Sequence, residues 1–145
     1  HPLGTAALPG HELRFHKRGS DGSAKLDAVR SASATASVTG VLYALDAGQK
    51  TRLDAIEGAG YACVTVQVNA PDGAWVEAFM YQAVDVDASL RPFDWYVAHV
   101  LAGAREAGLA EAQIAALAAT EHIEDPDPAR ARREAAIHAP PTDRR

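Results

Sequence analysis

The chain has 145 residues, of which 48% are apolar and 23% charged, and this composition fits a globular domain rather than a disordered or fibrous chain. A domain of this length buries roughly 70% of the surface that its unfolded chain would expose, which is enough for a core. The net charge of −5 argues against a nucleic-acid partner, because phosphate binding needs clustered Lys and Arg. No apolar run approaches the ~18 residues of a membrane span, and no signal-peptide pattern opens the chain. We therefore predict a cytoplasmic protein with no nucleic-acid or membrane partner.

Metal, disulfide and nucleotide chemistry are all disfavoured by the residues present. The single cysteine, Cys63, permits no intramolecular disulfide and no Cys-based zinc site, and we predict that it is a buried structural thiol. No two histidines have the i,i+4 spacing of a helical metal motif, and no P-loop or dinucleotide fingerprint occurs. The acidic run around His122, residues 121–127, is more typical of a solvated segment than of metal ligands. We therefore expect neither a metal nor a cofactor.

Strand patterns dominate the first third of the chain. Residues 1–10 are rich in Pro and Gly and are predicted to be irregular, whereas residues 12–16 alternate polar and apolar side chains as a half-buried strand does. Residues 17–25 have the composition of a loop. The small residues of 31–37 leave strand and loop both open. Residues 38–45 are more strongly apolar and predict a second strand.

A short helix follows, and its two ends are marked by residue type. Asp46 is a good N-cap residue, and Gln49 lies three residues later, which is the spacing of a capping box. Gly58 is a natural C-terminal stop. The pattern predicts a helix from about Ala47 to Glu57.

The rest of the chain predicts a hairpin and then helices. Two alternating segments, 63–68 and 75–81, flank the turn-forming Pro71-Asp72-Gly73. Helical periodicity then predicts helices at 92–108, 110–118 and 128–137, and the last residues, 138–145, are predicted to be a frayed tail. Strands followed by helices predict a single α+β domain over residues 1–145, with a small, mostly antiparallel or mixed, barrel-like sheet, flanking helices and a helical C-terminus.

Glu57 is the candidate for acid–base chemistry. It occupies the last turn of the predicted helix, where the negative end of the helix dipole disfavours a further negative charge. Asp54 lies on a neighbouring part of the same helix surface and acts in the same direction. A carboxylate that ionises less readily can both accept and return a proton. The local pattern by itself is nevertheless more typical of an ordinary exposed carboxylate.

Several ordered segments resemble the gamma-glutamylcyclotransferase family. The central one is the strand Gly40-Val41-Leu42-Tyr43-Ala44-Leu45 followed by Leu53-Asp54-Ala55-Ile56-Glu57-Gly58-Ala59-Gly60-Tyr61. The hairpin strand Ala78-Phe79-Met80-Tyr81 fits the same pattern, as do the segments at 8–15, 21–25 and 92–109. The likeness runs from about Leu8 to Arg130.

The resemblance implies both a fold and a reaction. Members of the family cyclise the gamma-glutamyl group of a small amide to 5-oxoproline and release an amine or amino acid, without a metal or cofactor, and this links them to glutathione metabolism. Glu57 matches the catalytic glutamate of the family. The partner that the resemblance implies is therefore a small gamma-glutamyl substrate.

Two tyrosines are implied as substrate-binding residues. Tyr81 matches a family position near the substrate, although a core tyrosine would look the same in sequence. Tyr61 either lines that pocket or anchors the loop after Glu57, and the anchor is favoured. Trp95 and Tyr96 are predicted to be packing residues at a helix start.

The sequence departs from the family pattern at its beginning. The family opens with a strand that ends in a Tyr-Gly-Ser-Asn loop, whose backbone N–H groups hold the substrate and stabilise the oxyanion. Gly-Ser occurs in 18–21 and again in 21–24, but neither segment has the flanking Tyr and Asn, and both follow the strand at 13–15. We therefore expect the first strand of the family to be missing from this chain.

Two alternative functions stay open, and so does the oligomeric state. The protein is a relative that acts on a specialised gamma-glutamyl amine, or it is a binding or interaction module that keeps the fold without catalysis. The Val and Ala faces of the predicted helices are also compatible with a homodimer, and the sequence does not decide the oligomeric state.

Overall fold

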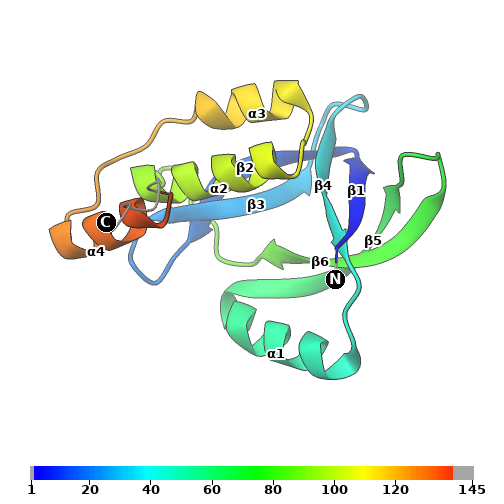
Figure 1. Cartoon of the computed structure of the whole chain (residues 1–145), viewed down its shortest axis with the longest axis horizontal. Coiled ribbons are helices and arrows are strands. Elements are labelled where there is room, and N and C mark those ends of the chain that lie inside the picture. The colour runs from blue at the N-terminus through cyan, green and yellow to red at the C-terminus, as the bar shows by residue number, and fades with distance from the viewer. Residues whose placement is uncertain (1, 139–145) are drawn as a thin grey trace, which may run out of the picture.

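In the computed structural model, which describes residues 2–138, the chain folds into two antiparallel sheets flanked by four α-helices (Figure 1). The larger sheet has the order β4-β1-β5-β6, and the smaller sheet pairs β2 with β3. The strands are β1 (Pro2–Pro9), β2 (His11–Arg18), β3 (Ala24–Arg30), β4 (Ser37–Tyr43), β5 (Tyr61–Asn69) and β6 (Trp75–Ala83). The helices are α1 (Ala47–Glu57), α2 (Asp94–Glu106), α3 (Glu111–Ala118) and α4 (Pro128–Ala135), with short 3-10 turns at Gly58–Gly60 and Ala136–His138.

The predicted α+β class is confirmed, but the barrel-like closure is wrong. β1 pairs with β4 along its length and with β5 only at Ala7↔Asn69. β2 pairs along its length only with β3. Because neither sheet closes on itself or on the other, the two remain open and face each other.

The first strand is a correction to the sequence prediction. Residues 1–10 were expected to be irregular, yet β1 pairs with β4 from Pro2↔Tyr43 to Pro9↔Ser37, with one register shift between Pro2 and Gly4. Both prolines lie at strand ends, where the missing N–H interrupts no continuing ladder. β3 and the loop at 31–36 likewise have side chains too small or too polar to identify them locally. Strand pairing, which the local sequence does not show, determines their structure.

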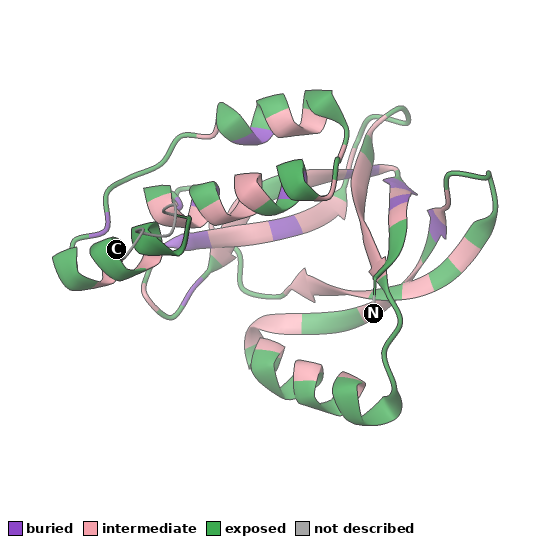
Figure 2. Ribbon diagram, in the orientation of Figure 1, coloured by how far each residue is buried: buried purple, intermediate pink, exposed green. Residues whose placement is uncertain are grey.

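Helix α1 forms within the predicted bounds. The Asp46 carboxylate accepts a hydrogen bond from the Gln49 backbone N–H at 2.7 Å, and the Gln49 side chain accepts one from the Asp46 N–H at 2.9 Å. Gly58 ends the helix with a φ of 62°, a conformation that favours glycine. No residue of α1 is buried, and Figure 2 shows the helix mostly exposed. Capping, rather than burial, therefore determines its bounds.

The core of the larger sheet lies on one face of its strands. Ala6, Leu8 and Val68 are buried there, and partly buried side chains pack around them from Val38, Leu42, Val66, Val76, Ala78 and Met80. Cys63 points to the other face and is exposed, so the prediction of a buried thiol is wrong. The predicted alternation along β5 is present: Val68 is buried and Val64 and Val66 are partly buried, whereas Cys63 is exposed.

The last three α-helices lie on the side of the molecule opposite α1 (Figure 1). Val97 and Ala104 of α2 and Leu117 of α3 are buried. The Gln113 side chain joins α3 to β4 by accepting from the Thr39 N–H at 2.8 Å and donating to the Thr39 carbonyl at 2.9 Å. Of the predicted frayed tail 138–145, all but His138 lies outside the described residues. Within residues 2–138, no helix is long and apolar enough to cross a membrane.

Asp125 corrects the picture of a fully solvated acidic run. Its side chain is 0% exposed and accepts from Arg130 Nε at 2.5 Å, Arg130 Nη2 at 2.6 Å and Trp95 Nε1 at 2.9 Å. The Arg130 guanidinium, with smaller contributions from the Asp127 and Trp95 N–H groups, holds the pKa of the Asp125 carboxyl far below its usual range. The residue therefore ties α4 to the start of α2. No group of three potential metal ligands exists among residues 2–138.

Replacement of Asp125 by Asn is expected to lower Tm by roughly 5 °C at neutral pH, because it removes the ion pair with Arg130. Since the folded-state pKa lies below the unfolded value of about 3.9, the stabilisation is complete above that value and is lost as pH falls through the folded pKa. The difference in Tm between the wild type and Asp125→Asn should therefore shrink below about pH 4. Calorimetry across this range measures it, and a difference that persists unchanged into strong acid would contradict the assignment.

Candidate functional site

Glu57 is the last residue of α1 and leads into the turn Gly58–Gly60 and then β5. Its side chain is half-buried. No residue within 2–138 forms an ion pair or a hydrogen bond with its carboxylate. The structure thus presents Glu57 as a carboxylate that is held in place by its helix end but has no partner of its own.

Asp54 does not act on Glu57 as the sequence suggested. Lys50 donates to both Asp54 oxygens, at 2.7 and 2.8 Å, and the Tyr81 hydroxyl donates to the same carboxylate. The Lys50 ammonium, more than the Tyr81 hydroxyl, lowers the pKa of the Asp54 carboxyl. Because Lys50 compensates the negative charge, the expected repulsion between Asp54 and Glu57 is largely cancelled.

The hydroxyl groups of Tyr61 and Tyr96 both bind the backbone of Leu26 in β3. The Tyr61 hydroxyl donates to the Leu26 carbonyl at 3.2 Å, and the Tyr96 hydroxyl accepts from the Leu26 N–H at 2.9 Å. Burial raises the pKa of both phenols, and the nearby Glu57 charge raises each further. Both therefore stay protonated near neutral pH. Since Tyr96 uses its oxygen as the acceptor, its own proton remains available to another group.

The predicted roles of the tyrosines can now be compared with their positions. Tyr61 anchors the segment after Glu57 onto β3, which was the favoured prediction. Tyr96 packs edge-on against Phe15, with ring centroids 6.1 Å apart, but it also makes the polar contact to Leu26 that its predicted packing role did not include. Nothing in the local sequence signals that contact, because Leu26 lies far away along the chain.

Tyr81 lies on the face of β6 that is turned to α1. Its hydroxyl donates to Asp54, and desolvation together with this bond raises the pKa of Tyr81 to about 12. No hydrogen bond within residues 2–138 joins Tyr81 to Glu57. The structure therefore brings Tyr61 to the Glu57 segment and places Tyr81 at the neighbouring Asp54.

Lys17 is a site residue that the sequence reading missed. Its Nζ lies 4.8 Å from the centroid of the Tyr61 ring, and a Cβ at Gly60 would be 2.7 Å from it. The absence of a side chain at Gly60 lets the ammonium reach the turn after Glu57. In the sequence Lys17 stands in the short basic stretch His16-Lys17-Arg18, and such a stretch at a strand end is usually exposed to solvent.

A buried pair of an acid and a histidine, Asp27 and His16, joins the strands next to Tyr61. Asp27, whose side chain is 1% exposed, accepts from His16 Nε2 at 2.7 Å and from the Ala83 N–H at 3.0 Å. His16 lies on β2, Asp27 on β3 and Ala83 on β6, so the pair joins the two sheets. It also fixes β3 next to Tyr61.

The segment around Ser23 is structural. The Asp21 carboxylate accepts from the Ser23 N–H and hydroxyl at 2.9 and 2.6 Å and from Lys25 Nζ at 3.0 Å. Lys25 Nζ also lies 4.6 Å from the Tyr96 ring centroid and 4.9 Å from that of Trp95. These contacts fasten the loop onto α2, so its Gly22-Ser23 pair has a structural role.

The outer edge of β5 has no partner strand along most of its length. The Val84 N–H donates to the Gly60 carbonyl, so in the register Tyr61↔Ala83 the even-numbered residues of β5 point their backbone groups to β6. The backbone groups of Cys63, Thr65 and Gln67 therefore point away from β6. Among residues 2–138 no strand pairs with them, since β1 reaches β5 only at Asn69.

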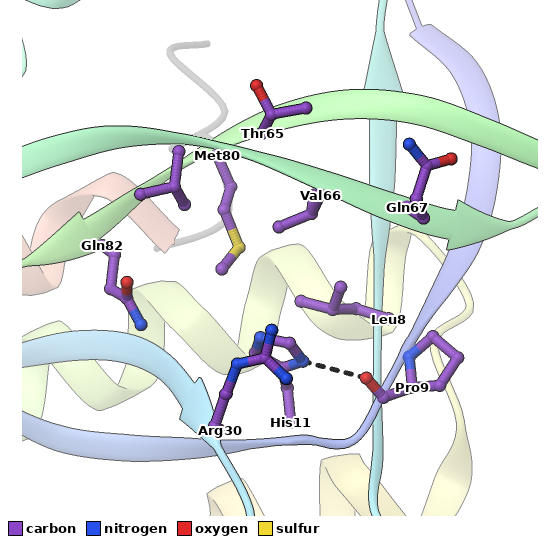
Figure 3. A pocket seen from close by; sticks show the side chains of 10 residues that line it. Leu8, Pro9, His11, Arg30, Thr65, Val66, Gln67, Met80 and Gln82 are labelled. Carbon is purple, nitrogen blue, oxygen red and sulfur yellow. Dashed lines mark hydrogen bonds between the residues drawn. The ribbon is translucent and has the colours of Figure 1, made fainter.

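A cavity of about 630 Å³ borders this edge, and four consecutive residues of β5, 64–67, line it. Figure 3 shows that Val66, Met80 and Gln82 point into the cavity from one sheet, and that His11 and Arg30 point into it from the other. The cavity therefore lies between the two sheets. Glu57, Tyr61 and Tyr81 are not among its lining residues.

Comparison with known proteins gives a family and a fold. Residues 37–117 match the AIG2-like family. Three solved structures cover 84% of this chain: a gamma-glutamyl cyclotransferase (20% identity, TM-score 0.77), the uncharacterized protein loc79017 from Homo sapiens (22%, 0.75) and YkqA from Bacillus subtilis (21%, 0.71). The matches span 75%, 75% and 46% of those chains, respectively. No curated protein matches the sequence.

At these identities the likeness to the solved structures shows the fold. The family match adds that the sequence from β4 to α3 follows one family pattern, and this stretch includes Glu57 and its turn. The structure supplies a carboxylate without a partner among residues 2–138, two protonated phenols whose pKa values its charge helps to raise, and an ammonium group at the turn that follows it. Such an arrangement is suited to moving a proton on a small polar substrate.

Proposed function

We propose, from the premise that this chain belongs to the AIG2-like family, that it is a gamma-glutamylcyclotransferase with Glu57 as general acid and base. The observation that carries the proposal is the Glu57 carboxylate, which is half-buried and unpaired among residues 2–138 and whose charge contributes to the raised pKa values of Tyr61 and Tyr96. The fold shared with a gamma-glutamyl cyclotransferase supports it.

The proposed chemistry moves protons from the attacking nitrogen of the substrate to its leaving nitrogen. The α-amine of the substrate is mostly protonated near neutral pH and cannot attack until it loses a proton, which Glu57 accepts. The amine nitrogen then forms a bond to the γ-carbonyl carbon of the same molecule, and the bond from that carbon to the leaving nitrogen breaks. Glu57 returns this proton to the leaving nitrogen, and the second proton, which the attacking nitrogen loses as it becomes the lactam N–H, follows the same route, so that 5-oxoproline and a protonated amine are produced. Because the attack is intramolecular, positioning supplies a large share of the rate.

The oxyanion that forms on the γ-carbonyl also needs hydrogen-bond donors. We propose that these donors are backbone N–H groups of a strand other than β1 to β6, and that this strand pairs with the free edge of β5 at Cys63, Thr65 and Gln67. The unpaired backbone groups and the adjoining cavity support this placement. Removing a single donor of this kind in other enzymes costs about 10²–10³ in rate, so the strand matters for turnover.

Incubation of the protein with a panel of gamma-glutamyl amino acids and gamma-glutamyl amines tests the proposal. Release of 5-oxoproline with a stoichiometric amine is the expected result. The ranking of the panel separates a general enzyme from a relative that prefers one specialised amine.

A second candidate is a binding module of the same fold that performs no chemistry. The observation that favours it is that the cavity between the sheets does not include Glu57. Calorimetric binding of gamma-glutamyl compounds without any 5-oxoproline release would select this function over the first.

A further inference from the structure

We infer that Lys17 binds the α-carboxylate of the gamma-glutamyl group, and thereby holds the neighbouring α-amine at Glu57. The inference rests on the proposed function, and it adds a substrate-recognition residue to that site.

The first observation is that the charge of Lys17 is uncompensated. Of the three lysines, Lys25 pairs with Asp21 and Lys50 pairs with Asp54, whereas Lys17 forms no ion pair within residues 2–138. The residue is only half exposed, and its ammonium has no acidic partner among residues 2–138. A bound anion would supply that partner.

The second observation is its location. Lys17 Nζ lies 4.8 Å from the Tyr61 ring centroid and against Gly60, on the turn that leads away from Glu57. The Glu57 charge acts on the same ring, since it contributes to the raised pKa of Tyr61. A cation and an anion thus both act on Tyr61, and they form no ion pair with each other among residues 2–138.

The third step is charge complementarity. The gamma-glutamyl group carries an ammonium and a carboxylate on one carbon atom. Glu57 attracts the ammonium from which it removes a proton, and Lys17 attracts the adjacent carboxylate. Two opposite charges that remain apart in the free protein match a zwitterion better than they match an amine or a carboxylate alone. A carboxylate on the leaving amino acid lies several bonds further from the reacting nitrogen and does not satisfy both contacts.

The test compares two substrates and three variants. The substrates are γ-glutamylalanine and the same compound with its γ-glutamyl α-carboxylate converted to a carboxamide. Lys17→Met keeps the aliphatic stem over Gly60 and Tyr61 and removes the charge, and Lys17→Arg keeps the charge. Arg105→Met is the matched control, because it removes one exposed positive charge from the last turn of α2.

For γ-glutamylalanine, Lys17→Met is expected to reduce kcat/KM about 30-fold, mainly through KM, as the loss of one charge-assisted hydrogen bond predicts. Wild type and Lys17→Met should treat the carboxamide alike. Lys17→Arg should recover most of the loss, and Arg105→Met should match the wild type. An equal loss on both substrates would indicate a structural role for Lys17 and would overturn the inference.

Binding separates this inference from the proposed reaction. Calorimetric titration of γ-glutamylalanine into Glu57→Gln, with and without Lys17→Met, requires no turnover. If the wild type releases 5-oxoproline but Lys17→Met changes neither KM nor binding, the Lys17 assignment is wrong and the function stands. If the wild type binds the compound through Lys17 yet releases nothing, the cyclotransferase proposal fails and the Lys17 site stands. No binding and no turnover would overturn both.

Discussion

Replacement of Glu57 by Gln is expected to reduce 5-oxoproline release from gamma-glutamyl substrates by about 10³-fold or more. The amide has nearly the shape of the carboxylate but cannot accept the proton of the α-ammonium group, so the nucleophile stays protonated. The loss should appear in kcat, while substrate binding changes little. The measurement is 5-oxoproline formation at saturating substrate.

Glu106→Gln is the matched control for this variant. Glu106 is the exposed last residue of α2, just as Glu57 is the last residue of α1, so the same chemical change is made at an equivalent helix position. Its activity should equal that of the wild type. Turnover that survives Glu57→Gln would show that Glu57 is not the general acid and base. It would also exclude the binding-module function, because the protein would still be an enzyme.

Replacement of Asp27 by Ala is expected to cost about 3 kcal/mol of unfolding free energy, because it leaves His16 and the Ala83 N–H without their buried acceptor. Asp27 is the point at which β3 contacts β6 through a hydrogen bond, so the loss should also loosen the two sheets against each other. Denaturant unfolding followed by circular dichroism measures the cost. In a domain of this size, a fall of roughly 10 °C in Tm would accompany it.

Two comparisons make the Asp27 result specific. Asp27→Asn keeps an oxygen that can accept from the Ala83 N–H, so it should lose less than the alanine variant. Asp85→Ala removes a carboxylate whose side chain is 62% exposed and should change stability by less than about 0.5 kcal/mol. If Asp27→Ala were as mild as Asp85→Ala, the buried pair would not be holding the sheets together.

Helices and strands whose ends are fixed by contacts between residues close in the chain could be predicted from the sequence. The capping box of Asp46 and Gln49 and the stop at Gly58 fix α1 by contacts that span three or four residues. The same holds for the hairpin of β5 and β6 and for α4, which begins at Pro128 after the Asp127 cap. β1 could not be read in this way, because its small residues become a strand only when β4 pairs with them.

The site divides along the same line. The sequence by itself determined that Glu57 ends a short helix before a glycine turn. The family resemblance, which the family match supports, predicted that this segment carries the catalytic residue. Only the tertiary structure decided which groups surround Glu57. The site draws on β2, β3 and α2, which are distant in sequence and contribute Lys17, Leu26 and Tyr96, respectively. Asp54, which the sequence suggested would act on Glu57, binds Lys50 and Tyr81. Local patterns record hydrogen bonds within one turn or one hairpin, whereas a site assembled from two sheets and a helix depends on how those elements pack, and no spacing along the chain encodes that.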